Sequence, residues 1–169
     1  MSSISKIEDM VAVWLKPLPH LPVAGQKWIS VNAWWIVLVG AILSGIGVLG
    51  MISTIFTTLA IWGAVTYYVG QSYGSWWILS SVISILFMAA IVIVSAISVN
   101  PLKSLQKKGW DLLFLTLIIS AVSVVVNVVI HFDVATFIFS IIFGAIGLAI
   151  SAYFLYEIRS YFKSATIAK

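Results

Sequence analysis

Cysteine and charge are scarce in this sequence of 169 residues. It has no cysteine, and only 8% of its residues are charged. The missing cysteine excludes disulfides, thiolate metal sites, iron–sulfur clusters and cysteine nucleophiles. Soluble domains carry charge on about a quarter of their residues, whereas 62% of this chain is hydrophobic. A folded chain this apolar could not cover its surface with polar groups, so the composition predicts an integral membrane protein.

Ionisable residues are also absent from the middle of every long apolar stretch. Ion-coupled transporters, proton pumps and voltage sensors place such groups inside the membrane despite their cost. A retinal protein would need a buried lysine, and a haem protein would need ligands such as histidine within the bundle. His20 and His131 both lie outside the apolar stretches. We therefore expect no catalytic residues, no metal site and no cofactor, and we predict that the protein is not an enzyme.

Four long apolar stretches occupy residues 31–69, 76–99, 110–130 and 134–158. A helix needs about 20 apolar residues to span a bilayer, so the last three stretches each fit one span. The first stretch is too long for one upright span and barely long enough for two. It predicts either one long, tilted helix that could bend or stop at Gly63 or Gly70, or two short spans.

The positions of the basic residues favour one long helix. With four spans all nine lie on one side of the membrane: Lys6, Lys16, Lys27, Lys103, Lys107, Lys108, Arg159, Lys163 and Lys169. Five spans would place the middle three opposite the first three, against the tendency of basic loops to stay in the cytoplasm. The sequence therefore predicts an all-α, polytopic membrane protein with four transmembrane helices as two antiparallel hairpins. Both termini would be cytoplasmic, in the inner (plasma) membrane.

The predicted domain plan has three parts. Residues 1–30 form an amphipathic helix and a proline-rich linker, residues 31–163 form the transmembrane domain, and residues 164–169 form a tail. The apolar stripe of the first helix consists of Ile4, Ile7, Val11, Trp14, Leu15 and Leu18. This helix could lie in the headgroup region or dock on the bundle's own loops. Pro101 is expected to end the second span, because proline cannot continue a helix.

Tryptophan and tyrosine gather near the predicted ends of the spans. They could mark the two membrane interfaces, or some could simply pack between helices. The residues of the inner group are Trp34, Trp35 and Trp110, and those of the outer group are Trp62, Tyr67, Tyr68, Tyr73, Trp76 and Trp77.

The polar residues of the third span share one face, at spacings of four, three and four: Thr116, Ser120, Ser123 and Asn127. This seam could form a polar pathway between the helices. Alternatively, hydroxyls in membrane helices bond to their own backbone or to a neighbouring helix as part of packing. The first and fourth spans have small residues on more than one face, which predicts close approach of a second copy or another subunit. These residues are Gly40, Ser44, Ala41, Gly45, Gly50 and Thr54, then Ser140, Gly144, Ala145, Ala149, Gly147 and Ser151.

Basic residues at the inner ends of the spans are candidate contacts for anionic lipid headgroups. They are Lys103, Lys107, Lys108, Arg159 and Lys163, and each could contribute about 1 kcal/mol near the membrane surface. Glu157 lies at the same depth and is expected to pair with one of the lysines. We expect the lipid bilayer to be the main partner, and no nucleic acid.

Two segments resemble a known group of proteins. The segments are KKGWDLLF at 107–114 and YFLYEIRSYFK at 153–163, together with the proline-interrupted leader. This combination resembles small four-span membrane proteins of bacteria with very small genomes. The resemblance implies the four-span topology, and it carries no functional residues. The small-residue faces and the lack of ionisable residues within the spans instead lead to the main hypothesis, a non-enzymatic structural or interaction subunit that binds another membrane protein or lipid. The alternative is a small channel or carrier for a small or apolar solute.

Overall fold

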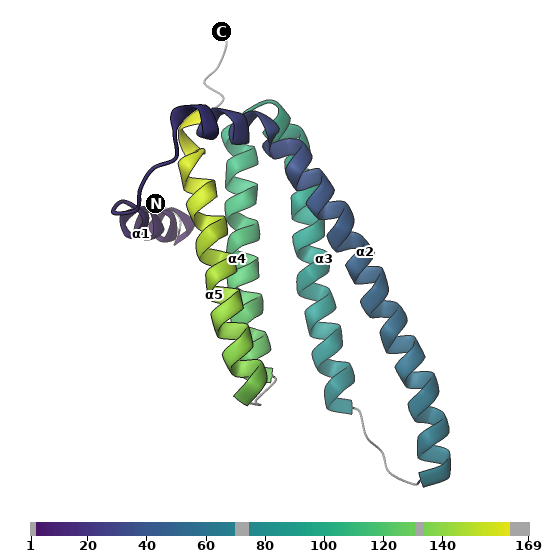
Figure 1. Ribbon diagram of the computed structural model, residues 1–169. Helices are drawn as coiled ribbons and strands as arrows, with labels where there is room; N and C mark the ends of the chain where they lie inside the picture. The colour runs from purple at the N-terminus through teal and green to yellow at the C-terminus, as the bar shows by residue number, and fades with distance from the viewer. Residues whose placement is uncertain (1–2, 70–74, 131–133, 163–169) are drawn as a thin grey trace.

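The computed structural model describes residues 3–69, 75–130 and 134–162, which form five α-helices and one short 3₁₀-helix (Figure 1). The helices are α1 (Ser3–Leu15), α2 (Val23–Val69), α3 (Ser75–Lys103), α4 (Lys107–Ile130), α5 (Val134–Glu157) and η1 (Arg159–Tyr161). Four of them, α2 to α5, contain segments long and apolar enough to cross a membrane. The predicted all-helical class and the number of candidate spans are therefore confirmed.

Helix α2 settles how the first apolar stretch is organised. It is one unbroken helix of 47 residues that continues through Gly63; Gly70 lies outside the described residues. At 1.5 Å per residue it is about 70 Å long, more than twice the hydrocarbon thickness of about 30 Å. It also begins at Val23, eight residues before the predicted start at residue 31.

The early start of α2 follows from the residues at its N-terminus. Proline is compatible with the first turn of a helix, where no N–H is needed, and the Gln26 N–H bonds back to the Pro22 carbonyl. The first turns of α2 run across the ends of α4 and α5 before the helix turns down beside α3 (Figure 1). Where it turns, Ser30 and Asn32 donate side-chain hydrogen bonds to backbone carbonyls one turn earlier, a pattern that often bends helices.

Helix α3 continues past the position where it was expected to stop. Pro101 lies inside the helix, which ends at Lys103, so the expectation that Pro101 ends this span is wrong. Packing explains the difference, since Leu102 is completely buried in the hydrophobic core. A tight turn then follows, in which Leu105 has a φ of 50° and the Gln106 N–H bonds to the Pro101 carbonyl.

Glycine is required where α4 begins, beside this turn. A β-carbon on Gly109 would lie 2.7 Å from the backbone nitrogen of Leu102 and 2.9 Å from the carbonyl carbon of Pro101. Backbone atoms cannot move aside as a flexible side chain can, so any larger residue would push α4 away from the end of α3. The glycine thus sets the close approach of these two helices.

Each of the long helices packs mainly on its neighbours in the sequence. Contacts join α2 to α3, α3 to α4, and α4 to α5, and α1 touches α5. No comparable set of contacts joins α2 to α5 within the described residues, and away from its first turns α2 runs beside α3 and diverges from α5 (Figure 1). The four long helices therefore form an open row rather than a closed bundle.

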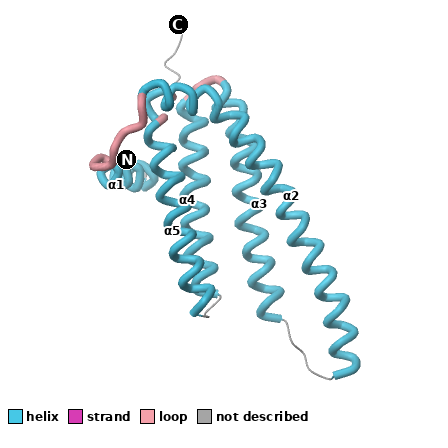
Figure 2. Tube along the Cα trace, viewed as in Figure 1, coloured by secondary structure: helices cyan, strands magenta, loops and turns pink. Residues whose placement is uncertain are grey.

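The hydrophobic core lies at one end of this row, which we call the basic end. It contains the start of α2, the end of α3, the start of α4 and the end of α5, and the pink loop that joins α3 to α4 in Figure 2 lies there. The buried core residues are Ala33, Leu102, Trp110, Phe114, Leu155, Ile158 and Phe162. Elsewhere large apolar side chains face outward, such as Leu43 and Phe56 on α2, with exposed fractions of 63% and 69%. Only lipid or another protein could cover that surface.

Candidate functional site

A groove of about 910 Å³ lies between α2 and α5 and reaches α3 and α4. We call it the α2–α5 groove. Small and hydroxyl-bearing residues line much of it: Gly40, Ser44, Thr116, Ser120, Gly147 and Ser151. Large apolar residues line the remainder, among them Ile36 and Phe143, which are 40% and 65% exposed. The groove is therefore mainly apolar and open to the surroundings.

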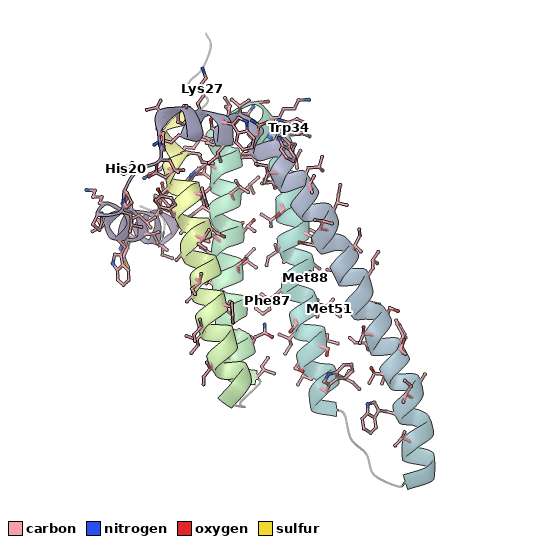
Figure 3. All side chains as sticks on the ribbon, in the orientation of Figure 1. His20, Lys27, Trp34, Met51, Phe87 and Met88 are labelled. Atoms are coloured by element: carbon pink, nitrogen blue, oxygen red, sulfur yellow. The ribbon has the colours of Figure 1, made fainter. Side chains whose placement is uncertain are left out.

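The glycines of α2 and α5 divide into two groups. A β-carbon on Gly47 would lie 2.8 Å from the side chain of Met88 on α3 (Figure 3), and one on Gly144 would lie 2.9 Å from Val124 on α4. These two glycines allow close packing within the chain. A β-carbon on Gly40 or Gly147 would meet nothing within 4 Å. The latter two leave free space in the groove that no side chain of the described residues fills.

The predicted polar seam of α4 divides between two surroundings. Thr116 and Ser120 line the groove, and the Thr116 hydroxyl donates to the carbonyl of Leu112 on the same helix. Asn127 lies outside the groove lining, and its side-chain oxygen accepts a hydrogen bond of 2.9 Å from Ser84 on α3. Its amide group donates to the carbonyl of Ser123. The four residues thus share a helix face, but the groove lining includes Thr116 and Ser120 and not Ser123 or Asn127.

Glu157 holds the linker between α1 and α2 against the end of α5. Its side chain is 7% exposed and bonds to His20 Nδ1 at 2.7 Å. It also accepts hydrogen bonds from the backbone N–H of Leu21 at 2.8 Å and from the side chain of Gln26 at 2.9 Å. The expectation that Glu157 pairs with a loop lysine is therefore wrong. The linker comes closer because the start of α2 crosses the end of α5.

Helix α1 is attached to the basic end through polar contacts. Glu8 is buried and forms an ion pair with Arg159. The Tyr156 hydroxyl donates to the Glu8 carbonyl, and the Tyr153 hydroxyl donates to the Pro19 carbonyl, both at 2.6 Å. On its exposed surface α1 carries apolar side chains, namely Ile7, Met10, Val13 and Trp14.

Trp110 is the centre of the core at the basic end. It is 1% exposed, and its indole N–H donates a 2.8 Å hydrogen bond to the Leu155 carbonyl. Its ring stacks on Phe114 and meets Tyr156 edge-on, with centroids 5.4 and 5.6 Å apart. For this residue the interface-belt interpretation is wrong, because its polar group is satisfied inside the protein rather than by lipid headgroups or water.

The predicted lipid-binding residues occupy different surroundings. The Lys103 ammonium lies over the Trp34 ring, 5.3 Å from its centroid, and Lys108 is exposed. Lys107 and Arg159 come together in a second cavity of about 470 Å³, which also includes Ser160. Lys163 lies outside the described residues.

Sequence reasoning missed several residues of the basic end. Glu8 was not among the predicted site residues, and His20 was noted only as lying outside the apolar stretches. The available signal was the clustering of Tyr153, Tyr156 and Glu157 within one turn at the end of an apolar span, where polar groups need partners. The partners themselves lie more than 130 positions away in the sequence.

Among residues 3–69, 75–130 and 134–162, no three histidine or acidic side chains come together as metal ligands would. No family model, curated protein or solved structure matches the chain. The function proposed below is therefore based on the geometry of the groove and of the basic end.

Proposed function

We propose that the protein is a non-enzymatic interaction subunit of the plasma membrane, whose α2–α5 groove receives a transmembrane helix of another membrane protein. In this proposal α2 to α5 cross the membrane as two antiparallel hairpins, and the basic end faces the cytoplasm. Helix α1 lies in the headgroup region, with Trp14 and its neighbouring apolar side chains toward lipid. The one-sided basic residues support this orientation.

The observation that carries the proposal is the free space beside Gly40 and Gly147 on the two walls of the groove. In lipid, apolar burial gives little driving force for helix association. Close backbone packing at small residues supplies it instead. The groove offers such residues on both walls, and Ser44 and Ser151 lie one turn further along each helix. An incoming helix could therefore approach α2 and α5 at the same time.

A solute carrier fits the cavity less well. A carrier for a polar solute would need a polar path, but most of the groove lining is apolar, and Asn127, the most polar group of the seam, lies outside it. Asn127 is instead engaged with Ser84 and Ser123. Of the four seam residues, Thr116 and Ser120 border the groove, and two hydroxyls suit occasional contacts with a helix better than a continuous solute path.

The test is site-specific photocrosslinking in native membranes. A photoreactive residue at Ser44, inside the groove, is compared with one at Leu49, which is 67% exposed on the same helix and outside the groove lining. We expect a protein adduct of defined mass from position 44 and none from position 49. An adduct of twice the chain mass would identify a second copy as the partner. Adducts with lipid alone, or equal protein adducts from both positions, would contradict the proposal.

A matched pair of variants separates groove filling from the general effect of larger residues. Gly40→Leu with Gly147→Leu fills the groove, whereas Gly50→Leu with Gly63→Leu adds the same side chains at positions that are equally open but outside it. We expect the first pair to reduce the crosslink from Ser44 at least fivefold and the second pair to leave it unchanged.

A further inference from the structure

The second cavity joins basic side chains from two helices that are distant in the sequence. Its volume is about 470 Å³. Lys107 is the first residue of α4, Arg159 is the first residue of η1, and Ser160 follows it. Aromatic rings complete the lining, from Trp110, Tyr156 and Phe162. None of these residues lines the α2–α5 groove, so the two cavities are separate sites.

The charges of this cavity suit an anion. Its lining contains two cationic side chains and the hydroxyls of Tyr156 and Ser160, with no carboxylate among the described residues. Glu8 lies next to it and pairs with one terminal nitrogen of Arg159. A guanidinium has five N–H donors in a planar fork, so one carboxylate leaves it capable of binding a second anion. Lys107 adds a positive charge at the N-terminus of α4, where the helix dipole also favours anions.

Arg159 is held in place before any ligand arrives. Its guanidinium carbon lies 5.3 Å from the centroid of the Trp110 ring and 5.9 Å from that of the Tyr156 ring. Contact with the aromatic faces and with Glu8 restricts the rotation of a long side chain, so less entropy is lost when the guanidinium binds a ligand. A fixed planar fork matches the oxygens of a phosphate group, which arginine often binds through two parallel hydrogen bonds.

We propose that the Lys107–Arg159–Ser160 cavity binds the phosphate group of an anionic phospholipid. The site lies where α4 begins and α5 ends, which in the proposed topology is the depth of the headgroups, and aromatic side chains adjoin its charged ones. A lipid phosphate could occupy it while the acyl chains stay in the bilayer. Lys103 and Lys108, which do not line the cavity, would contribute only through diffuse attraction to the membrane surface.

The test is lipid binding to the full chain in nanodiscs of zwitterionic lipid, with increasing amounts of phosphatidylglycerol and bound lipid counted by native mass spectrometry. Lys107→Gln should lower phosphatidylglycerol binding about fivefold, the equivalent of about 1 kcal/mol. Lys108→Gln removes the same charge one residue away and should lower it less than twofold. Equal losses from both variants would overturn the proposal, because they would show diffuse charge attraction without a defined site.

Two further measurements test the guanidinium fork and the source of the phosphate. Arg159→Lys keeps the charge beside Glu8 but removes the planar fork, so the chain should stay folded and bind phosphatidylglycerol at least threefold more weakly. Unchanged binding would contradict the role of the fork. In purely zwitterionic nanodiscs, inorganic phosphate alone is added and thermal stability is measured. Stabilisation that Lys107→Gln abolishes would assign the cavity to a soluble phosphate compound instead of a lipid. Loss of the Ser44 crosslink with normal lipid binding would refute the groove proposal alone.

Discussion

Trp110 offers the sharpest test of how the basic end is stabilised. Trp110→Phe keeps an aromatic ring for stacking on Phe114 but removes the indole N–H that donates to the Leu155 carbonyl. This carbonyl is among the last four of α5, which have no N–H donor within their own helix. Leaving such a buried group without its donor costs about 1–3 kcal/mol. The smaller phenylalanine ring also leaves empty part of the space that the Trp110 ring fills, since Trp110 is only 1% exposed. We therefore expect the free energy of unfolding to fall by about 2–4 kcal/mol in total.

The matched control is Trp35→Phe. The Trp35 indole also donates a 2.8 Å hydrogen bond, to Asn32 on its own helix, but the residue is 40% exposed. This variant should change stability by less than about 0.5 kcal/mol, as exposed substitutions usually do. Both are measured by SDS titration in mixed micelles, with near-ultraviolet circular dichroism reporting fixed aromatic packing. If the two variants lost equal stability, or if Trp110→Phe lost none, the account of a core built around the Trp110–Leu155 bond would be refuted.

Two other predictions address packing and topology. Gly109→Ala should destabilise the protein by about 1–3 kcal/mol in the same titration, because its β-carbon would meet the backbone of Leu102. The control is Gly25→Ala, at an open helical position, which should be neutral or stabilising by up to about 1 kcal/mol. Equal changes in stability from Gly109→Ala and Gly25→Ala would contradict the close approach of α3 and α4. To test the topology, reporters are fused after Lys27, at Ser72, at Ser104 and after Lys169. In that order they should report cytoplasmic, external, cytoplasmic and cytoplasmic locations. An external signal from Ser104 would disprove the four-span topology.

Hydrophobicity predicted the long helices well because each is determined by its own residues. The stretches 110–130 and 134–158 correspond closely to α4 (Lys107–Ile130) and α5 (Val134–Glu157). The prediction was wrong where distant contacts decide the outcome. Proline normally ends a helix, but the buried side chain of Leu102 keeps α3 helical through Pro101. A local rule could not include that contact, because the core around Leu102 forms only when all four long helices meet.

The candidate sites were harder to predict than the helices. The spacing from Thr116 to Asn127 predicts that those residues share one helix face, yet it cannot tell which helix lies opposite each of them. In the structure one part of the face borders the groove and another part bonds to Ser84 of α3. Likewise, the basic residues could be recognised as a group, but only the fold shows that Lys107 and Arg159 share a cavity while Lys103 lies over Trp34.

The distribution of polar contacts is compatible with an open row of helices that keeps its fold while the proposed partner helix binds. Hydrogen bonds and ion pairs that join distant segments concentrate at the basic end, among them the bonds of Glu157 to the linker and of Trp110 to Leu155. Gly40 and Gly147 lie along the groove, and the space beside them serves no internal contact in the described residues. A helix that entered the groove would therefore gain packing beside these glycines without breaking the bonds at the basic end. If so, filling the groove should reduce partner binding while leaving the stability measured at Trp110 unchanged.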